Sequence, residues 1–262
     1  GRSQFTPLSS TERNYLASLN VLIGCVKAGT KKVVITSSMS VYGDQKPPFT
    51  EDMPTAPVDI YGIAKTATEE ATRVLSQVYG FDYTIIRPHN VYGPRQNMAD
   101  PYRNVVAIFI NCLMQNKNFY IYGDGQGKRS FSYIDDVTPY IATAGTITKT
   151  NGQVINIGPK KEYTINKLAQ IVLSNFIENL NNIPAHLKPV YLKSRPQEVK
   201  YATCSDQKAR QLLGFKNSTT LENGVAKMVA WAKLTGPKKF KYLKNLEITA
   251  KSIPLTWKNK LI

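Results

Sequence analysis

The stretch DIYGIAKTATEE, residues 59–70, places a tyrosine and a lysine four positions apart, as Tyr61 and Lys65. A phenol has an ordinary pKa of about 10, so it acts as a base near neutral pH only where its ionised form is stabilised. A lysine one helical turn away can supply the stabilising charge, and a serine hydroxyl can relay the proton. The pattern fits a base that takes a proton from an alcohol while a nicotinamide accepts the hydride.

The spacing alone is not specific, because it occurs again at Tyr42 with Lys46 and at Tyr163 with Lys167. A glycine and two prolines surround the second match, so no helix is expected there to bring its side chains together. The third match spans the expected start of a later helix. Only the first match follows a strand whose end carries a cluster of hydroxyls: Ser37, Ser38 and Ser40.

Hydrophobic periodicity predicts the elements that position this pair. Helices are expected at residues 10–28, 60–79, 164–178 and near 221–234, and strands at residues 31–38, 81–88 and 189–192. The buried positions of the first two helices are expected to be Leu16, Leu19, Ile23, Val26, Ile60, Ala64, Ala67, Ala71, Val74 and Val78. A strand, a long helix and a strand in succession indicate a parallel crossover unit, whose ligands bind beyond the carboxyl ends of the strands.

Length and composition favour a soluble, globular protein. A chain of 262 residues with 42% hydrophobic residues can form one large domain, with or without a smaller lobe. No apolar run is long enough for a membrane span and no secretory leader opens the chain, so a cytoplasmic location is expected. The three cysteines are scattered and are expected to be buried thiols, and two histidines leave little material for a metal centre.

The formal net charge of +16 is concentrated toward the carboxyl end. Residues 237–262 carry seven lysines against Glu247, and this basic tail is expected to be solvated. Aromatic residues do not alternate with the lysines as a nucleic-acid stacking surface requires, so specific nucleic-acid binding is not expected.

Six motifs in order resemble the extended short-chain dehydrogenase/reductases of the nucleotide-sugar epimerase/dehydratase type: TSSMSVYGD, YGIAK, RPHNVYGPRQ, IYGDG with KRSFSYIDDV, NIG, and RPQE with KARQLLGF. The resemblance covers residues 12–235. It implies a Rossmann-like, doubly wound parallel sheet with a smaller C-terminal α/β lobe. Residues 1–95 and 130–160 would form the cofactor and catalytic core, and residues 96–129 and 161–236 the substrate lobe.

The resemblance also implies roles for individual residues. Ser38, Tyr61 and Lys65 would be catalytic. NAD would contact Asn14, Ser37, Tyr61, Lys65, Pro88 and His89. A UDP-sugar would contact Ser38, Ser40, Asn90, Tyr120, Tyr122, Arg129, Arg195 and Glu198.

The residues that follow the catalytic serine bear on the reaction. Dehydratases of this type carry Asp-Glu there and decarboxylases carry a glutamate, whereas this chain has Met39 and Ser40. The resemblance therefore implies a 4-epimerase similar to UDP-glucose 4-epimerase, acting on a UDP-hexose or, given the small Ala202 at a position resembling a sugar-pocket residue, a UDP-N-acetylhexosamine. A dehydratase or decarboxylase that uses other acids, and a non-catalytic nucleotide-sugar-binding chain, are the alternatives.

Members of this family open with a strand and a G-x-x-G-x-x-G turn that binds the cofactor pyrophosphate. The 262 residues contain no such turn, so the chain is expected to be an N-terminally truncated unit, with the turn preceding Gly1. The resemblance also implies a homodimer that pairs through the helices at residues 10–28 and 60–79.

Overall fold

The computed structural model describes residues 2–194, 201–249 and 253–262. Its α-helices are α1 (Pro7–Thr11), α2 (Ala17–Lys27), α3 (Ile60–Tyr79), α4 (Val105–Met114), α5 (Thr138–Thr146), α6 (Ile165–Leu173), α7 (Gln207–Leu213), α8 (Leu221–Thr235) and α9 (Leu255–Lys258). Its strands are β1 (Lys32–Thr36), β2 (Asp82–Pro88), β3 (Val91–Tyr92), β4 (Tyr120–Tyr122), β5 (Lys128–Arg129), β6 (Ser132–Tyr133), β7 (Gln153–Ile157), β8 (Tyr163–Thr164), β9 (Val190–Leu192) and β10 (Tyr201–Ala202).

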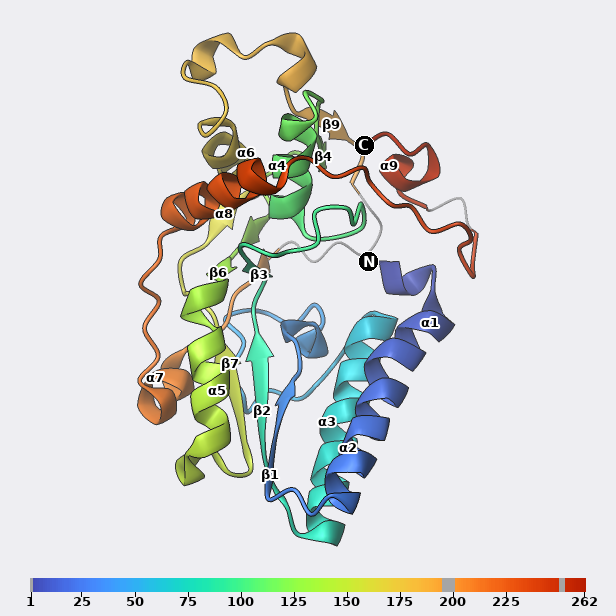
Figure 1. The fold of residues 1–262 in the computed structure, drawn as a ribbon, viewed down its shortest axis with the longest axis vertical. Helices are drawn as coiled ribbons and strands as arrows, with labels where there is room; N and C mark the ends of the chain where they lie inside the picture. The colour runs from blue at the N-terminus through green and yellow to red at the C-terminus, as the bar shows by residue number, and fades with distance from the viewer. Residues whose placement is uncertain (1, 195–200, 250–252) are drawn as a thin grey trace.

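The central sheet is parallel and has the order β1-β2-β7. Thr36 pairs with Ile86 and Pro88 pairs with Ile157, so the carboxyl ends of the three strands meet at one edge. Helices α2 and α3 cover one face of the sheet and α5 covers the other, with α7 beside β7 (Figure 1). The predicted α/β class with a parallel sheet is confirmed, and α3 is the crossover between β1 and β2.

The first predicted helix is present but is not a regular α-helix. Between α1 and α2 the chain forms a π-helical segment, Glu12–Leu16, without a break in helical backbone. The extra residue in a π-turn rotates the side chains that follow it. Leu16 is 47% and Ile23 39% exposed, and Leu22 is the buried residue of α2, which corrects the predicted apolar face.

Helix α3 has the predicted bounds. The Asp59 carboxylate accepts a hydrogen bond from the backbone N of Gly62 at 2.7 Å at its start, and Gly80 ends it in the left-handed conformation. Its buried face is unexpectedly polar and includes Thr68, Glu69 and Thr72, while Val74 and Val78 are more than half exposed, against the prediction. The two threonine hydroxyls donate to the carbonyl four residues earlier, which satisfies them inside the helix.

A second layer forms above the carboxyl edge of the sheet (Figure 1). Helices α4, α6 and α8 pack around a shared apolar core that includes Val106, Phe109, Leu168, Val225 and Met228. The strand predicted at residues 189–192 is β9, and it pairs in parallel with β4. Helices α4, α5 and α7 were not predicted from periodicity, because α4 is apolar on nearly every side and the other two are short.

The basic tail is not a solvated terminus, which corrects the prediction made from its charge. Phe240 and Ile262 are buried in the core of the second layer, and Trp257 is only 7% exposed. Full burial of an aromatic or branched side chain stabilises a fold by about 1.5–3 kcal/mol, so these residues offset the like charges of the lysines.

Of the three cysteines, Cys112 and Cys204 are buried thiols as expected, and Cys25 is half-buried. Among the described helices, none is both long and apolar enough to cross a membrane.

Candidate active site

The hydroxyl of Ser38 lies where β1 gives way to a short 3₁₀ turn, Met39–Tyr42. Ser38 is the N-cap of that turn, and its Oγ accepts hydrogen bonds from the Ser40 backbone N at 3.2 Å and from the Ser40 hydroxyl at 2.9 Å. Because the Ser38 oxygen accepts twice, its own proton is available to the phenol of Tyr61, with which Ser38 is hydrogen-bonded.

Tyr61 and Lys65 lie on the first two turns of α3 and face this serine. The Lys65 Nζ donates to the carbonyl oxygen of Thr36, the last residue of β1, at 2.9 Å. The same nitrogen lies 5.9 Å from the centre of the Tyr61 ring. The strand end and the helix start therefore bring together the three residues predicted to be catalytic.

Burial governs the titration of this site. It raises the pKa of Tyr61 above its ordinary value, while the Ser38 hydrogen bond and the charge of Arg103 lower it, and Asp59 raises it further. Burial also lowers the pKa of Lys65, which the charge of Glu69 opposes. The phenol is thus held neutral at rest, close to groups that favour its ionised form.

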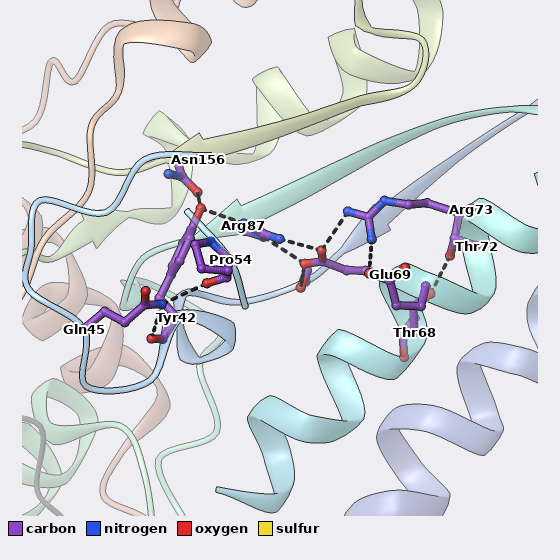
Figure 2. A network of polar contacts seen from close by, with 11 residues as sticks. Tyr42, Gln45, Pro54, Thr68, Glu69, Thr72, Arg73, Arg87 and Asn156 are labelled. Carbon is purple, nitrogen blue, oxygen red and sulfur yellow. Dashed lines mark hydrogen bonds and ion pairs between the residues drawn. The ribbon is translucent and has the colours of Figure 1, made fainter. Parts of the chain in front are cut away.

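A buried polar network supports the site from behind (Figure 2). Arg87 on β2 forms a bidentate ion pair with Glu69 on α3, at 2.9 and 2.6 Å, and donates to the Tyr42 hydroxyl at 2.7 Å. Tyr42 in turn donates to Asn156 on β7 at 2.9 Å. These bonds tie α3, β2 and β7 to the 3₁₀ turn that begins at Ser38.

Ser37 belongs to this network. Its hydroxyl donates to Glu69 at 2.6 Å, and it is only 2% exposed. Ser37 lines the cavity described next, but its hydroxyl is engaged with the carboxylate, so its contact with a cofactor stays a prediction.

A cavity of about 1290 Å³ opens at the carboxyl edge of the sheet. Most of the predicted site residues line it: Asn14, Ser37, Ser38, Ser40, Tyr61, Lys65, Pro88, Asn90, Tyr120, Tyr122 and Arg129. His89 and Ala202 are absent from the lining. Arg195 and Glu198 lie outside the described residues.

The other two tyrosine–lysine matches do not form such a pair. Tyr42 is fully buried in the network of Figure 2, whereas Lys46 is exposed. Tyr163 belongs to β8 and Lys167 to α6.

Residues 1–158 match the model of the NAD dependent epimerase/dehydratase family. A UDP-glucose 4-epimerase of Mycolicibacterium smegmatis is 32% identical over 232 residues, which cover 87% of this chain and 71% of that protein. The chain belongs to this family. The identification made from the motifs is confirmed, and with it the expectation of an NAD-dependent enzyme of the epimerase type.

Other members of the family differ in their reaction. A UDP-N-acetyl-alpha-D-glucosaminuronate decarboxylase of Bacillus cytotoxicus is 31% identical over 228 residues, covering 84% of this chain and 69% of that protein. The crystal structure of Thermotoga maritima UDP-glucose 4-epimerase with UDP-glucose superposes with a TM-score of 0.76 at 30% identity, over 86% of this chain and 71% of that one.

The residues expected on the cofactor side fit the nicotinamide end of the family's cofactor. Asn14 lies in the π-helical segment, where its amide donates to the Ser10 carbonyl at 2.8 Å, and Pro88 ends β2. Lys65 lines the same cavity, and its ammonium donates to the Thr36 carbonyl. The glycine-rich turn with which the family holds the pyrophosphate does not occur in this sequence.

His89 is a buried neutral side chain. Burial, followed by the charge of Arg129, lowers its pKa to about 3. Its two ring nitrogens have no hydrogen-bond partner among the described residues, and its Cβ packs closely against Gly158. Its predicted contact with the cofactor remains a prediction.

The described residues expected on the substrate side, Asn90, Tyr120, Tyr122 and Arg129, also line the cavity, together with Ser38 and Ser40. Asn90 has a positive φ of 40°, which asparagine tolerates, and its amide donates to the Ser130 carbonyl at 3.0 Å. Tyr120 and Tyr122 come from β4, and Arg129 from β5. The guanidinium of Arg129 donates to the Lys128 carbonyl at 2.9 Å.

The lining residues that the sequence reasoning missed include Tyr102, Arg103, Pro254 and Trp257. Nothing in the segment around Tyr102 and Arg103 signals a site. The tail did offer a signal, since an isolated tryptophan among lysines indicates burial more often than solvation.

Proposed function

We propose that the protein is an NAD-dependent 4-epimerase of a UDP-sugar, a UDP-hexose or a UDP-N-acetylhexosamine. The observation that carries the proposal is the hydrogen-bonded pair of Ser38 and Tyr61 beside Lys65, on the wall of a cavity at the carboxyl edge of a parallel sheet. Family membership supports the same reaction class.

The three residues divide the proton handling. The Tyr61 phenolate takes the proton from the sugar hydroxyl, and the Ser38 hydroxyl holds that oxygen and the phenol in one hydrogen-bonded line. Lys65 contributes the positive charge that makes the phenolate accessible near neutral pH. NAD supplies the hydride acceptor and donor when bound. Tyr61 then returns the proton when the keto sugar has turned over and been reduced from its opposite face.

The nucleotide end of the substrate would lie at the far end of the cavity. The residues proposed to hold it are Asn90, Tyr120, Tyr122 and Arg129, with Arg195 and Glu198 from the sequence prediction. Guanidinium groups suit a diphosphate because they can donate two parallel hydrogen bonds. The second layer would then act as the substrate lobe and the sheet with its helices as the cofactor and catalytic core.

The family's decarboxylases make a second candidate reaction, and the lining of the cavity argues against it. The position after Ser38 is a buried methionine, Met39. Asp59 and Asp100 are the carboxylates among the lining residues, and both have structural partners. Asp59 caps α3, and Asp100 pairs with Arg103 at 3.3 Å. Both carboxylates that line the cavity within the described part of the chain are therefore engaged in structural contacts, which disfavours their use as a second acid for elimination or decarboxylation.

The proposal is tested by incubating the full-length gene product and NAD with UDP-glucose, UDP-N-acetylglucosamine or UDP-glucuronate and following the anomeric protons by NMR. At least one of these is expected to give its 4-epimer, and Tyr61→Phe is expected to reduce the rate by about 10²–10⁴-fold. A net keto product or carbon dioxide would support the dehydratase or decarboxylase. Binding of a UDP-sugar with no turnover would support the non-catalytic alternative.

A further inference from the structure

Residues 237–249 and 253–262 form a strap, whose first part runs from the end of α8 across the second layer (Figure 1). Its start is fixed to α4. The backbone N of Lys238 donates to the Asn111 side chain at 2.9 Å, and the Asn111 amide donates back to the Lys238 carbonyl at 2.8 Å. Asn111 is fully buried, so this pairing holds the strap to the core of the layer.

The strap ends at the cavity. In α9 the backbone N of Thr256 donates to the Tyr122 hydroxyl at 3.2 Å, and the hydroxyls of the two residues lie 2.7 Å apart. Pro254 and Trp257 line the cavity together with Tyr120 and Tyr122. The strap thus reaches the part of the cavity proposed to receive the nucleotide.

The ring of Trp257 is held on two sides by other aromatic residues. It meets Phe5 edge-to-face at 5.8 Å between centroids and Tyr102 at 5.0 Å. Tryptophan has few rotatable bonds, and packing of this kind fixes them, so little conformational entropy remains to be lost on contact with a ligand. An immobilised indole on a cavity wall is a suitable surface for a flat, weakly polar base.

We propose that this strap completes the nucleotide subsite and that Trp257 contacts the pyrimidine base of the bound nucleoside diphosphate. The proposal rests on the proposed function, because it takes the ligand to be a UDP-sugar. Contact between a base and an aromatic side chain contributes about 5- to 100-fold in affinity. The lysines of the strap add a positive field that favours an anionic ligand.

The experiment compares UDP with inorganic pyrophosphate, which lacks the base, in calorimetric titrations of the full-length gene product. Trp257→Ala is expected to weaken UDP binding about 5- to 100-fold and to leave pyrophosphate binding within twofold. Leu261→Ala is the matched control, since Leu261 is a partly exposed apolar residue of the same strap and is not in the cavity lining. Its affinity for UDP is expected to stay within twofold.

A fluorescence measurement covers the case in which Trp257→Ala does not fold. Residues 1–262 contain two tryptophans, so Trp231→Phe leaves Trp257 as the only indole of this stretch, and Trp231→Phe/Trp257→Phe is the reference from which its emission is obtained by difference. UDP is expected to change the emission of this variant, and pyrophosphate is not.

Three results would overturn the inference: UDP binding by Trp257→Ala as tight as wild type, tighter binding, which would make the strap a cover over the cavity, or an equal loss for both ligands. Absence of UDP binding by the wild-type protein would instead contradict the proposed function as well.

Discussion

The environment of the Tyr61 phenol has opposing effects on its pKa. Burial raises its pKa, and the Ser38 hydrogen bond and the Arg103 charge lower it. Ser38, Tyr61 and Lys65 could be predicted from the sequence for two reasons. A tyrosine and a lysine four positions apart can form a proton-transfer site, and hydrophobic periodicity places the serine at the end of a strand and the pair at the start of a helix. Sequence reasoning could not find Arg103, whose approach to the phenol depends on the path of the chain between β3 and α4.

Replacing Arg103 should therefore move the pH dependence of activity. Arg103→Gln removes a positive charge that lowers the Tyr61 pKa, so the pKa rises and the base is ionised only at higher pH. The acidic limb of the kcat/KM profile is expected to shift to higher pH. Lys149→Gln is the control, because Lys149 is exposed beside the amino-terminal end of β7. An unchanged profile for Arg103→Gln would contradict this assignment.

At the scale of the element, α3 carries the catalytic pair on its first turns and a buried acid two turns further on. Periodicity predicted the bounds of α3 correctly, since Asp59 and Gly80 are strong boundary signals. The prediction of which face of α3 is buried was wrong. Glu69 can be buried because Ser37 and Arg87, which are distant in the sequence, form hydrogen bonds with its carboxylate. A hydrophobicity pattern cannot register an ion pair with Arg87, eighteen residues further along the chain.

Adjacent glutamates on α3 allow a controlled test of that network. Glu69 has a side chain that is 0% exposed, and Glu69→Gln leaves Arg87 buried without its counter-charge, which is expected to lower the free energy of unfolding by about 3–5 kcal/mol. Glu70→Gln alters a side chain that is 59% exposed and is expected to cost about 0–1 kcal/mol.

Urea denaturation followed by circular dichroism measures both variants. Equal losses of stability for Glu69→Gln and Glu70→Gln would show that the buried pair does not hold the site together.

At the scale of the whole molecule, α2 and α3 present an apolar surface to solvent. Exposed apolar residues on the two helices include Val21 at 62%, Val74 at 55% and Val78 at 65%. Large apolar side chains gathered on a protein surface mark an association site. We propose that it forms the homodimer contact expected from the family resemblance.

A charge on this surface should then dissociate the protein. Val74→Glu is expected to convert a dimer into a monomer in size-exclusion chromatography with light scattering, because the carboxylate would be buried without a partner. Leu234→Glu, on α8 and 88% exposed, is expected to leave the dimer intact. A monomeric wild-type protein would remove this proposal.

The sequence also misjudged the tail at this scale. The seven lysines of the tail led to a prediction that it is exposed to solvent. In the folded molecule its aromatic residues Phe240 and Trp257 are buried. The charge of a segment predicts its exposure to solvent only when the rest of the fold offers no surface for its apolar residues. Here α4, β4 and the N-terminal segment provide such a surface.

The central claim is that Ser38, Tyr61 and Lys65 support removal and return of a hydride at one sugar carbon. The most direct test follows UDP-glucose labelled with deuterium at C4, incubated with the full-length gene product and NAD and analysed by mass spectrometry and NMR. The label is expected at C4 of the 4-epimer, and Tyr61→Phe is expected to suppress its formation. Loss of the deuterium to water, or a product that is not the 4-epimer, would contradict the account.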